Sequence, residues 1–181
     1  MEETFVMIKP DGVQRRLVGR ILSRFEDVGL TIKAMKWMVA SRELVARHYP
    51  DSEEWLRTVG EKTLTSYREY GLDPLPAMGT TDPLKIGRQV KAWLVDFITS
   101  GPVVVMVLEG NHAVQIVRKI VGHTIPAFAD SGTIRGDFAV DSPDWANAEQ
   151  RPVKNLVHAS GNVEEAKAEI ALWFPEYEGC S

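Results

Sequence analysis

The chain has 181 residues, of which 44% are hydrophobic and 25% are charged, the proportions of an ordinary globular domain. This composition excludes a long disordered protein, and a chain of this length can bury a core without disulfide or metal staples. The formal net charge of -4 argues against binding of nucleic acid through bulk charge. The single cysteine, Cys180, can form neither an internal disulfide nor a cysteine-rich zinc site, and it favours a reducing compartment.

The sequence offers no segment with the character of a membrane helix or a signal peptide. Its longest strongly apolar run, residues 102–108, is far shorter than the ~20 residues that a membrane-spanning helix requires. The N-terminal residues include Glu2, Glu3 and Lys9 and lack the basic and apolar regions of a signal peptide. We therefore expect a cytoplasmic protein with no membrane partner.

The first half of the chain predicts two strands and three helices from its hydrophobic periodicity. Gly29 stands where a glycine would end the first helix, and Ser41 is a suitable N-cap for the second. The predicted elements are, in order, a strand over 4–8, a helix over 17–28, a strand over 30–39, a short helix over 41–48 and a longer helix over 53–70.

The second half begins with a turn-rich stretch rich in proline and glycine and contains two further strands. The continuous apolar run at 103–108 is typical of a central strand buried on both faces. The predicted elements are turns over 71–83, a helix over 84–99, a strand over 103–108, a helix over 113–122, a long loop over 123–152, an edge strand over 153–157 and a helix over 163–174. Loops as long as the one at 123–152 tend to be functional.

This order of elements indicates a fold of the α+β class. Four strands joined by long crossovers predict a ferredoxin-like α/β sandwich, in which helices cover a four-stranded antiparallel sheet. We expect a single domain over residues 1–181. The sequence alone leaves the order of the strands open.

His158 differs from the other three histidines because it lies between a short predicted strand and a helix. A side chain at a strand end is rigidly held yet reachable by a substrate. Glu169, on the following helix, could fold back and accept a hydrogen bond from one imidazole nitrogen, which would leave the other nitrogen free as a nucleophile. The alternative is a solvated Glu169 with no partner.

Two further segments carry basic residues suited to anions. Lys9 ends the first strand and precedes a predicted tight Pro-Asp-Gly turn, although this pattern alone favours an ordinary turn with an exposed lysine. Arg135 lies between Gly132 and Gly136, where backbone can approach a ligand and a guanidinium can bind phosphate through two hydrogen bonds. The chain contains neither the P-loop motif nor the G-x-G-x-x-G motif, so a bound nucleotide would have to be held by other residues than those of the two common nucleotide-binding motifs.

Together these motifs resemble those of nucleoside diphosphate kinases. The resemblance rests on three segments in the family's order, which are Val6-Met7-Ile8-Lys9-Pro10-Asp11-Gly12-Val13-Gln14-Arg15, Gly132-Thr133-Ile134-Arg135-Gly136-Asp137-Phe138, and Asn155-x-x-His158-Ala159-Ser160. His48-Tyr49, Ser100-Gly101-Pro102 and Val107-Leu108-Glu109-Gly110 also match. The likeness covers nearly the whole chain except about 50–89 and 142–152.

The resemblance implies a ping-pong transfer of the γ-phosphoryl group from a nucleoside triphosphate to a nucleoside diphosphate. His158 would be the nucleophile through Nδ1, with Glu169 and Ser160 orienting it and Lys9 assisting catalysis. The residues placed like the family's nucleotide contacts are Lys9, Tyr49, Leu94, Arg118, Thr124, Arg135 and Asn155, with Leu94 near the base. Mg²⁺ would arrive on the nucleotide phosphates, with no protein ligand to the metal. The resemblance also implies a homo-oligomer, a hexamer or else a tetramer.

The sequence departs from the family pattern in three places. Gly161 stands where the family usually has an aspartate, and Asn162 with Glu165 could form a shifted capping box instead. Residues from about 60 to 85 form an insertion like that of archaeal members. The family places an aromatic residue here to stack on the base, and the matching position falls near Val90, which is not aromatic. Either Trp55 or Trp93 could take its place, or the stacking could be weak. The third departure is the long loop over 142–152, for which the sequence offers no function.

Two alternatives belong to other functional classes. One is a family member that binds nucleotide as a regulatory module and is impaired in catalysis, which Gly161 alone supports. The other is a sequence-specific DNA-binding protein, which the acidic charge balance disfavours.

Overall fold

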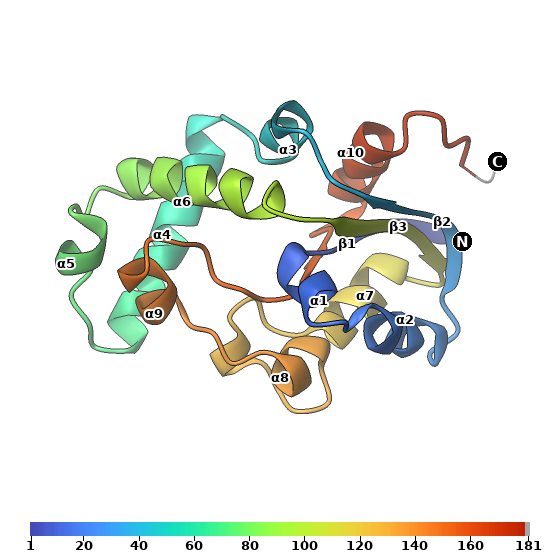
Figure 1. Ribbon diagram of the computed structural model, residues 1–181, viewed down its shortest axis with the longest axis horizontal. Helices are drawn as coiled ribbons and strands as arrows, with labels where there is room; N and C mark the ends of the chain where they lie inside the picture. Colours follow the sequence, from blue (N-terminus) through green and yellow to red (C-terminus); the bar gives the residue numbers. More distant parts are fainter. Residues whose placement is uncertain (180–181) are drawn as a thin grey trace.

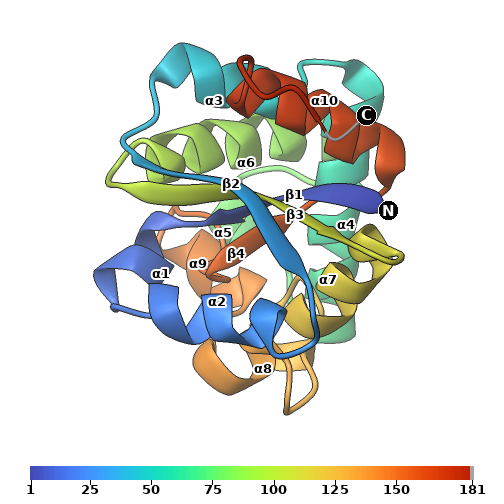
Figure 2. The ribbon, with the colours of Figure 1, turned by 90° about the vertical axis from the view of Figure 1, so that its right-hand side faces the viewer.

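The computed structural model describes residues 1–179, so Cys180 lies outside the described residues. It contains a four-stranded antiparallel sheet in the order β2-β3-β1-β4. The strands are β1 (Glu2–Ile8), β2 (Thr31–Met38), β3 (Val103–Gly110) and β4 (Val157–Ala159). Helices cover both faces of the sheet, which confirms the predicted ferredoxin-like α+β sandwich (Figures 1 and 2).

The alternation of side chains along β3 divides the core into two layers. Val104, Met106 and Leu108 point to one face of the sheet, and Val103, Val105 and Val107 point to the other. The first face packs against α1 (Pro10–Gln14), α2 (Val18–Glu26), α7 (Ala113–Val121) and α8 (Ile134–Phe138), and the second against α3 (Arg42–His48), the C-terminal part of α6 (Pro83–Ile98) and α10 (Val163–Trp173). Burial of β3 on both sides explains its continuous apolar sequence.

The long helices α4 (Glu53–Glu69) and α6 pack tightly against each other and extend beyond the sheet (Figure 1). Both helices carry a glycine at the crossing. A Cβ atom on Gly60 would lie 1.9 Å from the carbonyl oxygen of Pro83, and one on Gly87 would lie 1.9 Å from that of Leu56. The approach therefore requires glycine at both positions.

The two segments that the sequence left without a function pack against each other. Helix α5 (Leu75–Met78) and α9 (Pro143–Ala148) are in contact, and α9 also contacts α4. Tyr67, Met78 and Ile86 form a small separate core beneath these helices. The segment over 142–152 thus serves in part as a packing partner for the helices that precede the central strand.

Four predicted segments differ from the structure. The stretch predicted as turns over 71–83 contains the short helix α5. Pro10 to Gln14 is a short helix rather than a tight turn, because proline fits the first helical position and an acidic residue follows it in the first turn. The stretch over 123–152 contains α8, α9 and the 3₁₀ helix Pro126–Phe128 instead of being one loop. The last strand begins only at Val157, because the preceding backbone makes other hydrogen bonds. The N–H groups of Lys154 and Leu156 donate to the carboxylates of Asp141 and Asp11, and residues 155–157 form a tight turn.

No helix within residues 1–179 is both long enough and apolar enough to cross a membrane.

Candidate active site

His158 lies in β4 opposite Met7 of β1 and is held by a carboxylate from α10. Its Nε2 atom is 2.6 Å from Oε1 of Glu169. Ser160 donates to the other oxygen of the same carboxylate at 2.6 Å and lies 3.3 Å from the carbonyl oxygen of Phe5. An ionised Glu169 requires the proton of a neutral His158 to reside on Nε2, which leaves a lone pair on Nδ1.

The surroundings of His158 keep its imidazole neutral. Burial lowers the pKa of His158 well below its usual range, and the positive charges of Lys9, Arg135 and Arg118 act in the same direction, against the opposing charge of Glu165. Burial raises the pKa of Glu169. Because a neutral imidazole is the nucleophilic form, the site supports attack by a nitrogen atom at neutral pH.

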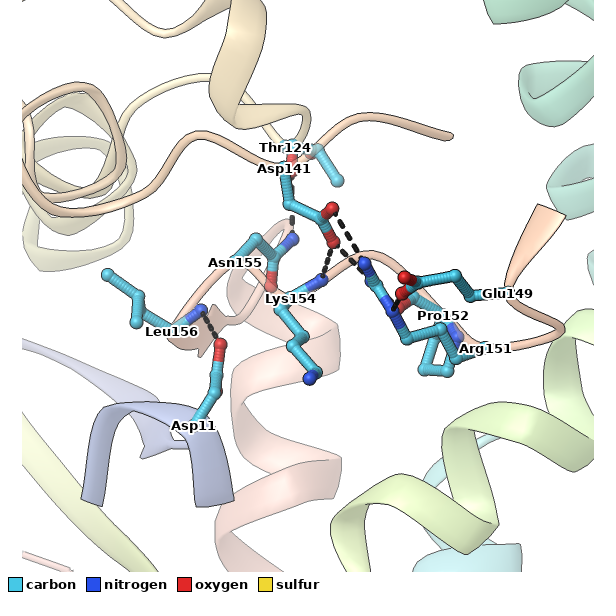
Figure 3. A network of polar contacts seen from close by, with 9 residues as sticks. All are labelled: Asp11, Thr124, Asp141, Glu149, Arg151, Pro152, Lys154, Asn155 and Leu156. Atoms are coloured by element: carbon cyan, nitrogen blue, oxygen red, sulfur yellow. Dashed lines mark hydrogen bonds and ion pairs between the residues drawn. The ribbon is translucent and has the colours of Figure 1, made fainter. Parts of the chain in front are cut away.

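Lys9 is buried at the end of β1 and is joined to Asn155. Its Nζ atom donates to Oδ1 of Asn155 at 2.8 Å. Nδ2 of Asn155 in turn donates to the carbonyl oxygen of Thr124 at 2.8 Å (Figure 3). Burial and the charge of Arg135 lower the pKa of Lys9 to about 8, with Asp11 opposing them. Lys9 is therefore not the exposed lysine of an ordinary turn.

Arg135 is buried and uses each of its nitrogen atoms to hold backbone. Nε donates to the carbonyl oxygen of Asn155 at 3.2 Å, and the two terminal nitrogens donate to those of Gly122 at 2.9 Å and Val157 at 2.6 Å. Burial and the nearby charge of Arg118 lower the pKa of Arg135 to about 10. Since a guanidinium has five N–H groups, Arg135 can hold the backbone and still offer a donor to a ligand.

The backbone immediately before β4 adopts a strained conformation. Leu156 has a φ angle of 71°, and the N–H of Val157 donates to the carbonyl oxygen of Asn155 at 2.8 Å, which closes a three-residue γ-turn. A residue other than glycine with such a φ angle destabilises the folded state by about 1–3 kcal/mol. Such a cost persists only where neighbouring groups hold the turn, and Figure 3 shows one of them, the carboxylate of Asp11 on the N–H of Leu156.

The structure also brings His48 into the site, although the sequence pattern did not single it out as a catalytic or binding residue. Its ring lies edge-on to that of His158, with 4.6 Å between centroids, and its Nδ1 atom is 3.3 Å from Nε1 of Trp173 and 3.4 Å from Oε1 of Glu169. Burial and the charge of His158 lower the pKa of His48 to about 3. Its position at the end of a short helix, directly before Tyr49, was the available signal.

Ligand-type atoms of His48, His158 and Glu169 all lie within 4.8 Å of one another. The carboxylate oxygen of this group is already bonded to His158, and Trp173 approaches the facing nitrogen of His48. Mg²⁺ prefers oxygen ligands to imidazole, so this group has the wrong donors for that ion.

Tyr49 and Leu94 lie on the side of the site formed by α3 and α6. Tyr49 is buried against His48, with 4.7 Å between centroids, and burial raises the pKa of its hydroxyl above the usual range. Leu94 and Trp55 pack on the hydrophobic cluster that contains Tyr49. Trp93 packs instead on the small core below α4, which leaves Trp55 as the tryptophan beside Tyr49.

The start of α10 explains how the chain tolerates Gly161. Asn162 is the N-cap and accepts a hydrogen bond from the N–H of Glu165 at 2.8 Å, while the Glu165 carboxylate accepts from the N–H of Gly161 at 3.0 Å. A Cβ atom on Gly161 would lie 2.6 Å from that carboxylate. Glu165 thus supplies a negative charge at the helix N-terminus, where an anion is stabilised.

Comparison with known proteins identifies the family. The family model "Nucleoside diphosphate kinase" matches residues 2–57 and 85–179. The chain is 56% identical over 178 residues to a nucleoside diphosphate kinase of Pyrobaculum aerophilum, covering 98% of this chain and 97% of that protein. It is 40% identical to the Methanothermobacter thermautotrophicus enzyme over 181 residues, covering 100% of this chain and 92% of that protein.

Solved structures agree with this assignment. The crystal structure of an NDP kinase from Pyrobaculum aerophilum superposes with a TM-score of 0.90 at 54% identity and covers 96% of this chain and 95% of that one. A second structure is a transition-state mimic of the nucleoside-diphosphate kinase from Borrelia burgdorferi with bound vanadate and ADP. It superposes with a TM-score of 0.75 at 32% identity, and the match covers 99% of this chain and 92% of that one. The chain belongs to the nucleoside diphosphate kinase family.

Proposed function

We propose that His158 carries the phosphoryl group in this enzyme's transfer from a nucleoside triphosphate to a nucleoside diphosphate. Nδ1 of His158 attacks the γ-phosphorus as the bond to the β–γ bridging oxygen breaks, and the diphosphate leaves. A terminal phosphate oxygen of a second diphosphate then attacks the phosphorus, the P–N bond breaks, and free His158 returns. The observation that carries the proposal is the 2.6 Å contact between Nε2 and Glu169, which leaves Nδ1 as the nucleophile.

Basic side chains supply the charge stabilisation that this reaction needs. Phosphoryl transfer requires alignment and neutralisation of charge more than covalent assistance. Lys9, Arg118 and Arg135 each lower the pKa of His158 through their positive charges, which supports their placement around the phosphates. Ser160 and Glu169 orient the imidazole in this proposal, and Lys9 also balances charge in the transition state.

Mg²⁺ is proposed to bind through the nucleotide phosphates. The carboxylates near His158 are already engaged, Glu169 with the imidazole, Asp11 with the N–H of Leu156 and Glu165 with the N–H of Gly161, and the other charged groups that act on His158 are cations. This donor set suits a phosphate chain that brings its own cation. The ion would neutralise phosphate charge and help to align the phosphates.

The nucleoside is proposed to lie between the Tyr49 and Thr124 sides of the site, with Asn155 and Thr124 contacting phosphate or sugar and Leu94 packing near the base. Trp55 is the aromatic residue beside Tyr49, with 6.0 Å between ring centroids, and this supports it as the residue that contacts the base. Packing against the base, rather than hydrogen bonding to it, would accept several bases.

We also propose that residues from about 60 to 85 are an insertion in a single domain over 1–181, that the chain forms a homo-oligomer, and that it is cytoplasmic. The gap in the family match between residues 57 and 85 supports the insertion. The edge strand β2 exposes large apolar side chains, with Met35 51% and Trp37 63% exposed, which supports a subunit contact there. Sedimentation would distinguish the hexamer from a tetramer.

A labelling experiment tests the role of His158. The enzyme is incubated with γ-labelled ATP, freed of nucleotide, and examined for acid-labile, base-stable label, which is then chased with a different nucleoside diphosphate. We expect label on the wild-type enzyme that the diphosphate removes, and no label on His158→Ala. Label that survives in His158→Ala would contradict the proposal. A wild-type enzyme without label would favour the impaired, regulatory alternative.

A further inference from the structure

We infer that Asp11 is a positioning residue for phosphoryl transfer, because its buried carboxylate holds the γ-turn that places Asn155 and also balances the charge of Lys9 and Arg135. The inference rests on the proposed roles of Lys9 and His158. Asp11 lies in the first turn of α1, is 6% exposed, and is assigned no contact with substrate. Its position two residues after Lys9 links the first strand to the segment that leads into β4.

The first part of the inference comes from backbone contacts on both sides of Leu156. Oδ2 of Asp11 accepts the N–H of Leu156 at 3.1 Å (Figure 3). The N–H of Lys9 donates to the carbonyl oxygen of Leu156 at 2.8 Å. Arg135 holds the flanking carbonyl oxygens of Asn155 and Val157. The strained turn is therefore held both from the N-terminal end of α1, through Lys9 and Asp11, and from α8, and Asp11 is the side chain that takes the N–H group of Leu156.

The turn matters because Leu156 lies between Asn155 and His158, two residues of the proposed reaction. Asn155 binds Lys9 through its side chain, and His158 follows two residues later in β4. If Leu156 relaxed to an ordinary extended conformation, the direction of the chain between these residues would change. Asp11 thus acts on the site through the backbone rather than by touching substrate.

The second part comes from charge. Asp11 is a negative group among several cations, and its charge raises the pKa of both Lys9 and Arg135. Its Oδ1 atom is buried and has no hydrogen-bond partner within residues 1–179. Asp11 of α1 and Arg135 of α8 act on the charge of Lys9. Lys9 in turn lowers the pKa of His48 in α3 and of His158 in β4. Arg118 of α7 is linked to this group through its effects on His158 and Arg135.

The pH dependence of kcat/KM separates these effects from a merely structural role. Lys9 must be protonated to stabilise phosphate, so kcat/KM falls as the pH rises through the pKa of Lys9, near 8. Asp11→Asn keeps an oxygen for the N–H of Leu156 and removes the charge. We call the decrease in kcat/KM with rising pH the alkaline limb, and we expect it to occur about 1 pH unit lower in Asp11→Asn than in the wild type. Asp11→Glu keeps the charge and displaces the carboxylate, so its limb should stay near that of the wild type while kcat falls.

Asp141 provides a matched control. Its carboxylate accepts the N–H of Lys154 at 2.7 Å and pairs with Arg151, so it is also an aspartate that holds backbone in this segment (Figure 3). It is not among the charges that act on Lys9. Asp141→Asn should therefore lower the melting temperature and leave the alkaline limb at the wild-type pH.

The outcomes distinguish this inference from the proposed function. Lys9→Arg should move the alkaline limb beyond the measured range. If it does not, the role of Lys9 fails and the inference about Asp11 fails with it. If the limb belongs to Lys9 but stays in place in Asp11→Asn, the inference alone is overturned. Melting curves establish that each variant is folded, and Asp11→Ala, expected to lose at least tenfold in kcat, replaces Asp11→Asn if the amide does not fold.

Discussion

Replacement of Glu169 by glutamine should weaken catalysis while leaving the protein at least as stable. The carboxylate receives Nε2–H of His158 and the hydroxyl of Ser160, each at 2.6 Å. A glutamine can still accept from the imidazole through its oxygen, and its amide can donate to Ser160. The variant therefore changes the charge of the site more than its geometry.

The size of the effect follows from the loss of one charged acceptor. Positive charge develops on the imidazole as Nδ1 attacks phosphorus, and a carboxylate stabilises that charge better than an amide. Hydrogen bonds to charged groups contribute about 1.4 kcal/mol more than neutral ones, which corresponds to about a tenfold decrease in kcat.

Stability should change in the opposite direction. Burial raises the pKa of Glu169 in the folded state above its unfolded value. Such a group stabilises the fold at low pH, and that contribution is lost as the pH rises through the folded pKa. At neutral pH the ionised, buried Glu169 is thus a cost to folding that Glu169→Gln removes.

Two measurements check this reasoning. Single-turnover phosphorylation of the enzyme by ATP reports the chemical step, and urea unfolding at neutral and acid pH reports stability. We expect slower phosphorylation together with unchanged or higher stability at neutral pH. A variant that phosphorylates at the wild-type rate, or one destabilised by more than about 2 kcal/mol, would refute it.

Three further predictions concern the fold and its response to pH. Asn162→Ala should lower the free energy of unfolding by about 1 kcal/mol because it removes the cap of α10, and a thermal melt identical to that of the wild type would contradict this. Gly87→Ala should cost about 1–3 kcal/mol because the new methyl group meets the Leu56 carbonyl, whereas Gly19→Ala, in open space, should be neutral or stabilising in the same melts. The pKa of His48 near 3 means that the unfolded chain takes up a proton below about pH 6.5 that the folded chain does not. His48→Phe should therefore gain stability over the wild type by about 1.4 kcal/mol per pH unit as the pH falls to about 4, and a difference in urea unfolding that does not change with pH would exclude this explanation.

The layered fold followed from short-range patterns in the sequence. The apolar run of β3, its alternation between two faces, and the amphipathic helices α2, α7 and α10 can each be recognised from the residues of that segment alone. The order of the strands did not follow, because antiparallel pairing of β1 with β3 and β4 joins segments more than 90 residues apart in the chain.

The same distinction between local and long-range contacts applies to the candidate site. The contact between His158 and Glu169 was expected from a strand followed by a helix, since both residues lie within one local unit. His48 and Asp11 were not expected as parts of the site. Their contacts, to Trp173 and Leu156, cross from one end of the chain to the other, and a γ-turn at a leucine has no sequence signature.

The proposed insertion illustrates a third case. The two long helices at its ends, α4 and α6, were predicted from periodicity, but their crossing depends on Gly60 and Gly87, whose importance appears only when the helices are in contact. The packing of α9 on α4 and α5 likewise joins two separate segments whose individual sequences give no sign of a common surface.

The position of the phosphoryl group on the imidazole tests the central claim most directly. Nitrogen-15 NMR of the phosphorylated enzyme, labelled at histidine, distinguishes phosphorus on Nδ1 from phosphorus on Nε2. The contact of Nε2 with Glu169 predicts a single phosphohistidine at position 158, substituted on Nδ1. Phosphorus on Nε2, or on a histidine other than His158, would contradict the account.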